Sequence, residues 1–200
     1  TDDSSQNLDV AEECSTIVPQ SSVAQLGAVV DCGDRQVIDV LWVYTPAALN
    51  DIGTEEWIEL FCELSIEDAN EAFSNSDLPF AVRMVGLMPT MYDEGGDHLT
   101  LIQGQSDGVM DEIHEARDLL AADLVVLITV DGYCGIAYIA PTNEAYGFQK
   151  ISSGCLVATS AFRHELGHNL GSKHWSTDQG GFFPYSAGHV LAFEGGETFG

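Results

Sequence analysis

Three histidines and one glutamate lie close together in the stretch HELGHNLGSKH, at positions 164–174. An α-helix advances about 100° per residue, so His164 and His168 would project from the same side of a helix. Glu165 would project within about 100° of both histidines, close enough for its carboxylate to reach a water bound to a shared metal ion. The spacing therefore indicates a metal site with a neighbouring base.

A third histidine follows a glycine at the point where the helix should end. Gly171 comes three residues after His168, a position at which helices commonly end in a left-handed residue that glycine adopts without cost. The reversal would let His174 approach the metal from outside the helix. Three neutral imidazoles and one open position are typical of catalytic zinc, whereas structural zinc is closed by four ligands. We predict one Zn²⁺ on these histidines; the alternative is an ordinary surface cluster.

The helix that carries the motif also has an apolar side. This side faces away from the two histidines and should pack on the core; it comprises Phe162, Leu166 and Leu170. We expect the helix to begin between residues 156 and 160, with Thr159 or Ser160 as its N-cap.

Upstream of the motif, β-branched and apolar strand patterns alternate with helical ones. The expected elements are a strand at 36–45, a helix at 55–74, a strand at 80–88, a helix at 107–120 and a strand at 123–130. This alternation predicts an α/β fold with a twisted, mostly parallel sheet, in which the almost wholly apolar third strand is central. Residues 132–155 suit an edge strand and loops, and irregular, glycine-rich sequence follows Gly171.

Composition excludes several classes of partner. The 200 residues suffice for one domain, and 32 acidic against 6 basic side chains give a net charge of −26, which repels nucleic acid and anionic membranes. No apolar run approaches the roughly 20 residues of a membrane helix. We expect a monomer that acts on a protein or peptide substrate.

The cysteines and the first residues suggest export. The chain starts with Thr-Asp-Asp and lacks a leader, so we expect a processed, secreted product. Its five cysteines are too dispersed for a metal cluster and suit disulfides. An odd number leaves one unpaired, and Cys62 is the candidate because it lies within an apolar helical pattern. We interpret residues 1–35 as an extension or prosegment remnant and residues 36–200 as the catalytic domain.

The motif resembles the metzincin zinc signature HExxHxxGxxH. VIDVLWVYTPAA, ADLVVLITV and CGIAY are similar to segments of reprolysin-like bacterial metalloendopeptidases, including the peptidyl-Asp group, over roughly residues 36–190. The resemblance implies a zincin-like (metzincin) fold, with an upper subdomain to about residue 171 and a small irregular C-terminal subdomain at 172–200. It also implies a zinc endopeptidase in which His164, His168 and His174 hold the metal and Glu165 is the general base that takes the proton from metal-bound water.

The resemblance extends to the substrate cleft and the disulfides. A substrate strand would add to the segment that contains Gly135, Ile136, Ala137 and Tyr138. Two bridges are expected, one joining Cys134 to Cys155 and the other joining Cys14 to Cys32; the first would contribute about 3 kcal/mol on the chain-entropy model.

Two positions depart from the metzincin pattern. No methionine follows His174, although metzincins have a methionine-containing turn after the third histidine, so we expect the chain to be truncated. Trp175 stands where many relatives have an acidic or small residue. Two alternatives follow: a metal-binding or adhesion module without activity, which intact Glu165 argues against, and a latent zymogen in which the Cys14 thiolate occupies the open zinc position.

Overall fold

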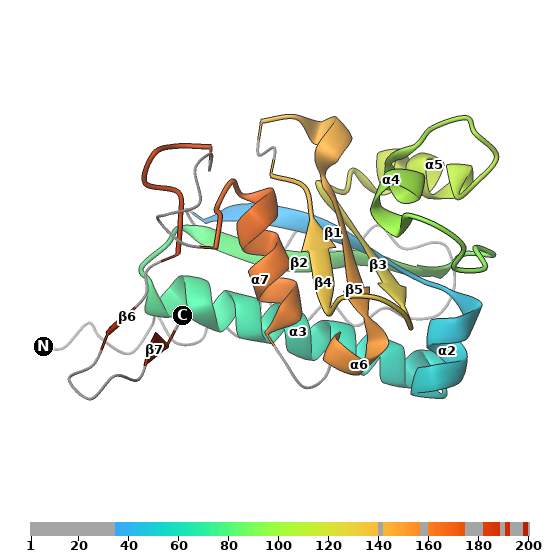
Figure 1. Cartoon of the computed structure of the whole chain (residues 1–200), viewed down its shortest axis with the longest axis horizontal. Helices are drawn as coiled ribbons and strands as arrows, with labels where there is room; N and C mark the ends of the chain where they lie inside the picture. Colours follow the sequence, from blue (N-terminus) through green and yellow to red (C-terminus); the bar gives the residue numbers. More distant parts are fainter. Residues whose placement is uncertain are drawn as a thin grey trace, which may run out of the picture.

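A five-stranded sheet forms the centre of the structure, a computed structural model that describes residues 35–139, 142–156, 160–174, 182–188, 191–192 and 198–199. The strand order is β2-β1-β3-β5-β4 (Figure 1). The strands are β1 (Gln36–Tyr44), β2 (Phe80–Pro89), β3 (Leu124–Thr129), β4 (Gly135–Ala137) and β5 (Phe148–Ser152). All neighbouring pairs are parallel except β4, which runs antiparallel to β5 at the edge. The mostly parallel α/β sheet predicted from the sequence is confirmed.

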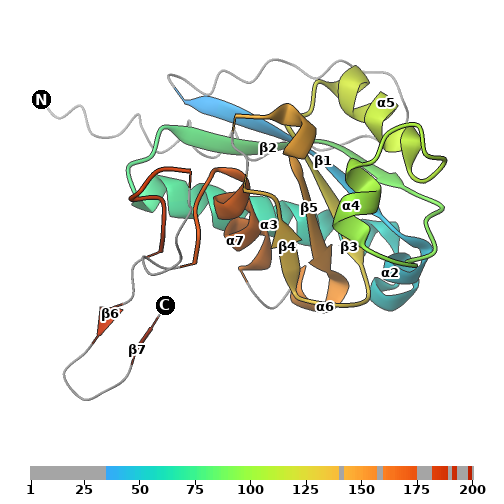
Figure 2. The same cartoon turned by 45° about the horizontal axis from the view of Figure 1, so that its top comes forward.

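Helices cover both faces of this sheet (Figures 1 and 2). One face packs against α2 (Pro46–Ile52), α3 (Glu55–Asn75), α6 (Ser153–Leu156) and α7 (Ala161–Asn169). The opposite face packs against α4 (His98–Gln103) and α5 (Asp111–Leu120). A 3₁₀ turn, η1 (Glu144–Tyr146), precedes β5, and β6 (Leu191–Ala192) pairs with β7 (Thr198–Phe199) near the end of the chain. This small antiparallel pair was not expected in the irregular C-terminal region.

Strand β1 shows why the sheet has two cores. Successive side chains of a strand point to opposite faces. Val40, Trp42 and Tyr44 accordingly enter the core with α3 and α7, whereas Leu41 and Val43 enter the core with α4 and α5. All six residues of β3 are buried, which confirms its predicted central position.

Three helices and one strand of the five-stranded sheet were missed by the sequence patterns: α2, α4, α6 and β5. Helix α2 begins directly at Pro46, where Thr45 caps it by accepting a hydrogen bond from the Ala48 amide at 3.0 Å. Helix α4 has only six residues, and Asp97 caps its N-terminus. Strand β5 is buried throughout, but polar Gln149 and Lys150 hide its apolar pattern. These elements depend on tertiary packing more than on local periodicity.

Helix α5 begins at Asp111, so the expectation of a helix from 107 was wrong. The preceding backbone enters left-handed conformations at Ser106, Gly108 and Met110, with φ of 59°, 86° and 57°, which a continuous helix cannot include. The Asp111 carboxylate accepts hydrogen bonds from the Gly108 amide at 3.0 Å and the Asp107 amide at 3.3 Å. This turn replaces the expected first helical turn.

The cysteines are placed as follows. Cys134 and Cys155 are joined by a disulfide, and Cys62 is free and fully buried in α3. Cys14 and Cys32 lie outside the described residues, as do the rest of the expected extension and Trp175. Among the described helices, none is both long and apolar enough to cross a membrane.

Candidate metal centre

The motif helix α7 is held against the sheet by its apolar side. Phe162 and Leu166 are 2% and 1% exposed, and the Phe162 ring packs on Trp42 with centroids 4.9 Å apart. Leu170 was expected in the same stripe but is 39% exposed, because it lies just beyond the last helical residue, Asn169.

The start of α7 differs from the expected cap. Ser160 occupies the N-cap position, yet its side chain makes no capping hydrogen bond to the helix backbone. Its hydroxyl instead accepts a hydrogen bond from Arg163 Nη2 at 2.7 Å, and Arg163 Nη1 also pairs with Asp68 of α3 at 3.0 Å. Thr159, the alternative cap, lies outside the described residues.

The end of α7 has the reversal that the glycine predicted. Gly171 has φ of 99°, a left-handed conformation that favours glycine. The Gly171 amide donates to the His168 carbonyl at 2.8 Å, and the Ser172 amide donates to the Gly167 carbonyl at 2.9 Å. These two bonds form a Schellman motif, which satisfies helix carbonyls that would otherwise lack partners.

The reversal brings the three histidines together. His174 Nε2 lies 3.1 Å from His164 Nε2 and 3.1 Å from His168 Nε2. His168 Nδ1 lies 2.7 Å from the Ser172 carbonyl, which can only accept, so this nitrogen carries the proton and Nε2 presents its lone pair. The pKa of His164 is lowered by burial and by the neighbouring His168 and His174, which favours its neutral, metal-binding form.

This geometry fits a metal ion. Nitrogen ligands about 2.1 Å from a tetrahedral zinc lie roughly 3.4 Å apart, close to the two observed separations. Among the described residues, these three histidines are the only group of His, Cys, Asp or Glu side chains arranged to hold a metal. The described residues also supply no fourth side chain to the set.

Sequence patterns did not reveal the segment that supports His174. The Lys173 amide donates to the Ser186 carbonyl at 3.0 Å, and the Gly188 amide donates to the Lys173 carbonyl at 2.9 Å. A Cβ on Gly188 would lie 2.1 Å from the His174 carbonyl oxygen, so only glycine allows this approach. Residues 182–188 therefore fix the backbone that carries the third histidine.

Asn169 is another unexpected support. Its side chain is almost fully buried, and Nδ2 donates to the Tyr138 carbonyl at 3.1 Å and to the Phe148 carbonyl at 3.2 Å. These bonds join the end of α7 to the sheet beside β4, where helix and edge strand lie side by side (Figure 1). Nothing in the spacing of a single asparagine distinguishes it from a surface residue.

Glu165, the residue after His164 in α7, lies against the edge strand β4. It is 5% exposed, and a Cβ added to Gly135 of β4 would lie 2.3 Å from its Oε1. Its Oε2 is buried and has no hydrogen-bond partner among the described residues. Burial raises the pKa of Glu165 to about 7, while Lys150 acts in the opposite direction. A carboxylate with this proton affinity can exchange protons near neutral pH.

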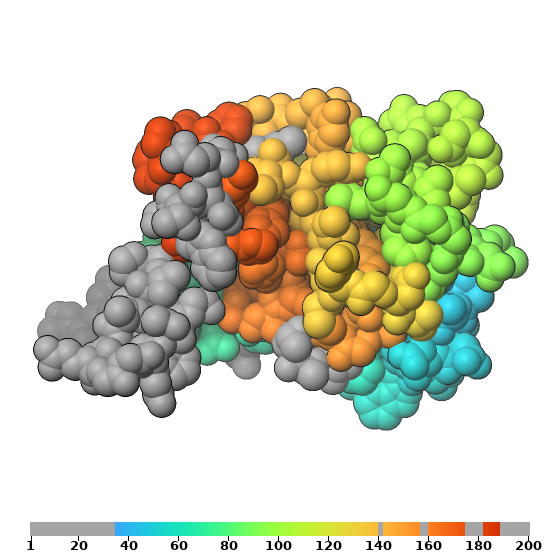
Figure 3. Space-filling view, in the orientation of Figure 1, coloured from blue at the N-terminus to red at the C-terminus, as the bar shows by residue number. Residues whose placement is uncertain are grey.

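The residues expected along the cleft do not all lie on one strand. Gly135, Ile136 and Ala137 form β4, and Ile136 is 43% exposed. Tyr138 follows the strand and turns back toward the core, where its hydroxyl donates to the Leu99 carbonyl at 3.4 Å and its ring packs on Tyr146. In the space-filling view, the surface around residues 130–139 adjoins that of α7 on one exposed face (Figure 3).

The chain is similar in sequence to known metallopeptidases. The model of the reprolysin-like metallopeptidase family M12B matches residues 62–175. A peptidyl-Asp metalloendopeptidase of Stenotrophomonas maltophilia strain K279a is 30% identical over 88% of this chain and 43% of its own length. One from Xanthomonas campestris pv. campestris is 28% identical over 78% of this chain and 38% of its own length.

A solved structure of a chaperone–substrate complex aligns with a TM-score of 0.60 and 28% identity, over 70% of this chain and 27% of that one. The chain thus spans less than half the length of these relatives. Because the family model covers more than half of the chain, including the histidine motif, the chain belongs to the reprolysin-like M12B metallopeptidases.

Proposed function

We propose that this chain is the catalytic part of a zinc-dependent endopeptidase. The observation that carries the proposal is the convergence of His164, His168 and His174 at 3.1 Å separations beside a buried glutamate. When bound, zinc would polarise the scissile carbonyl and make an attached water acidic. His164, His168 and His174 would hold it.

Glu165 would act as the general base. Its position on the same helix, one residue after His164, supports this role, and its carboxylate is not part of the group of side chains that could hold the metal. Apolar burial makes the carboxylate a good proton acceptor, so it would take the proton of the attacking water and deliver it to the leaving amine. No described residue needs to form a covalent bond to the substrate.

The substrate would bind as an extended strand along β4. Among the strands that the structure describes, β4 is the edge of the sheet and pairs only with β5. An unpaired edge offers backbone N–H and C=O groups to a peptide, and alternate side chains then set specificity. The contact between Gly135 and Glu165 would place the scissile bond near the start of the strand.

The names of the relatives suggest cleavage beside aspartate. A site for an acidic side chain needs a cation, and this chain has only six lysines and arginines. Arg83 pairs with Asp39, Arg163 pairs with Asp68, and Lys150 is buried. Arg163 and Lys173 are the basic residues adjacent in sequence to proposed ligands, His164 and His174 respectively. Cleavage-site profiling on a mixed peptide library tests this substrate class.

The Cys134–Cys155 disulfide supports a secreted protein, since such bonds persist in oxidising compartments. Secretion is tested by finding the protein in the culture medium.

The decisive experiment compares the parent protein with Glu165→Gln. We expect chelator-sensitive cleavage of casein by the parent and a loss of at least about a thousandfold in kcat for the variant, with zinc still bound. Casein cleavage by Glu165→Gln at the parental rate would refute the assignment of the base. A parent that binds zinc without cleaving anything would favour the alternative of a metal-binding module.

A further inference from the structure

Lys150 is a lysine in the interior of the protein. It lies in β5, which is buried along its whole length, and Lys150 itself is only 2% exposed. Lysine is almost never fully buried unless its charge is compensated, because transfer of an ammonium group out of water is unfavourable. The mechanism proposed above does not use this residue.

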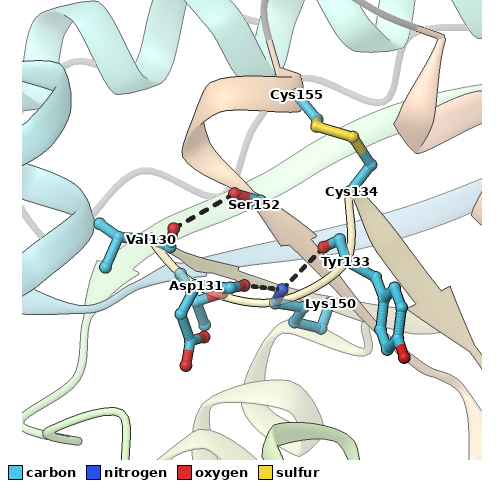
Figure 4. Close-up of a disulfide and its surroundings, with 8 residues drawn as sticks. Val130, Asp131, Tyr133, Cys134, Lys150, Ser152 and Cys155 are labelled. Atoms are coloured by element: carbon cyan, nitrogen blue, oxygen red, sulfur yellow. Dashed lines mark hydrogen bonds between the residues drawn. A yellow bond between two sulfur atoms is a disulfide. The ribbon is translucent and has the colours of Figure 1, made fainter.

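The ammonium group holds the turn that leads from β3 to β4 (Figure 4). Lys150 Nζ donates to the Asp131 carbonyl and, at 2.9 Å, to the Tyr133 carbonyl. Between them, Gly132 has φ of 78°, and a Cβ there would lie 3.2 Å from Nζ. The turn is therefore wrapped around the lysine head group.

The same turn is hydrogen-bonded to the end of β5, the strand that contains Lys150. The Ser152 amide donates to the Cys134 carbonyl at 2.9 Å, and the Ser152 hydroxyl donates to the Val130 carbonyl at 3.5 Å. Cys134 is in turn bonded to Cys155. Gly135 comes next in the chain, and its backbone contacts the Glu165 carboxylate. A short path thus connects the lysine to Glu165.

The charges around Lys150 are acidic. Asp131, Glu94 and Glu165 act on the ammonium and favour its charged form, against the effect of burial, which lowers the pKa of Lys150. Glu94 also accepts a hydrogen bond from the Val130 amide at 3.1 Å, so it holds the start of the same turn. Lys150 is consequently the positive group in an acidic region that includes Glu165.

We propose that Lys150 is a positioning residue: by holding residues 131–133 it sets where the edge strand β4 lies against Glu165. The inference rests on the proposed function, because β4 is taken as the strand that binds substrate. It goes beyond the zinc ligands and the base, since Lys150 touches neither metal nor substrate.

The test uses Lys150→Met, which keeps the length of the side chain but removes both charge and donors, in the full-length protein. We expect an increased KM for an extended peptide and a decrease of about tenfold to hundredfold in kcat/KM, with zinc content unchanged. Hydrogen exchange of the backbone amides of residues 131–137 should be faster. Lys150→Gln keeps a donor without the charge, and the same changes should appear in weaker form.

Arg83→Met is the matched control. Arg83 forms a partly buried ion pair with Asp39 at 2.7 Å, on strands β2 and β1, and β2 is the opposite edge of the sheet from β4. This variant should lose stability but keep the parental KM and the parental exchange of residues 131–137.

The two proposals fail in different ways. A parent without chelator-sensitive cleavage would refute the proposed function, and the exchange comparison would still decide whether Lys150 holds the turn. Parental exchange at residues 131–137 in both Lys150 variants would overturn the inference. So would an unchanged KM together with a smaller amount of active protein, which is the result expected from a purely structural lysine.

Discussion

The Glu165 carboxylate lies directly against the backbone of Gly135: a Cβ on this glycine would be 2.3 Å from Oε1 and 2.6 Å from Cγ of the glutamate. Gly135 does not have a positive φ, so the requirement for glycine here is one of space and not of backbone conformation. The edge strand can therefore approach the proposed base only because residue 135 has no side chain.

Gly135→Ala should push Glu165 and β4 apart. We expect kcat/KM to decrease by about a hundredfold, since a displacement of about 1 Å in an active site has effects of this size, and stability to decrease by about 1–3 kcal/mol from overpacking. Steady-state kinetics and thermal unfolding measure the two effects. Gly154→Ala is the control, because a Cβ at Gly154 meets nothing within 4 Å. A Gly135→Ala enzyme with parental kcat/KM would show that the contact is unimportant for catalysis.

Metal binding should weaken in acid. Histidine binds a metal only in its neutral form, so protons compete with the ion and the metal is retained above the pKa of the ligands and released below it. The pKa of His164 is lowered by burial first and by His168 and His174 next, so its neutral form persists below the usual range of about 6.5. We expect zinc to be retained at neutral pH and released only as the pH falls below the usual histidine range of about 6.5, measured by dialysis and metal analysis.

His114→Gln provides the control for this titration. His114 lies on α5, where its ring packs on Phe148 on the opposite face of the sheet from α7. The variant should release zinc over the same pH range as the parent. Zinc content that stayed constant through acidification would be incompatible with a site of three imidazoles.

The sequence predicted the parts of this structure that follow from the spacing and polarity of neighbouring residues. The histidine motif fixes its own geometry, because a helix places His164 and His168 on one side and Gly171 then reverses the chain. Strands β1 and β3 are confirmed because continuous apolar and β-branched residues have few alternatives to a buried strand.

The parts that were missed depend on contacts between distant residues. Strand β5 contains the polar residues Gln149 and Lys150. No local pattern shows that the ammonium group of Lys150 donates to two carbonyls in the turn after β3. Asn169 and the segment 182–188 likewise support the site through hydrogen bonds to residues far away in sequence. Their roles become visible only in three dimensions.

Removal of the Cys134–Cys155 bridge should reduce stability. The bridge joins residues 21 apart, for which the chain-entropy model gives about 3 kcal/mol of stabilisation. We expect the double variant Cys134→Ser and Cys155→Ser to unfold at a lower denaturant concentration by about that free energy. Cys62→Ala, which removes a buried free thiol without opening a bridge, serves as the comparison. Equal stability of the double variant and the parent would mean that the bridge does not constrain the unfolded chain.

Asn169→Leu should loosen the junction between the metal helix and the edge strand. The side-chain amide of Asn169 donates to the carbonyls of Tyr138 and Phe148. Leucine has no donor, so both carbonyls would lose this hydrogen bond in the interior of the protein. We expect a loss of about 1–3 kcal/mol in the free energy of unfolding and a weaker affinity for zinc, because the next residue toward the N-terminus is His168. Denaturant unfolding and zinc titration measure these changes. Asn75→Leu, at the exposed end of α3, should alter neither quantity, and an Asn169→Leu protein with parental zinc affinity would show that the helix end holds its position without this amide.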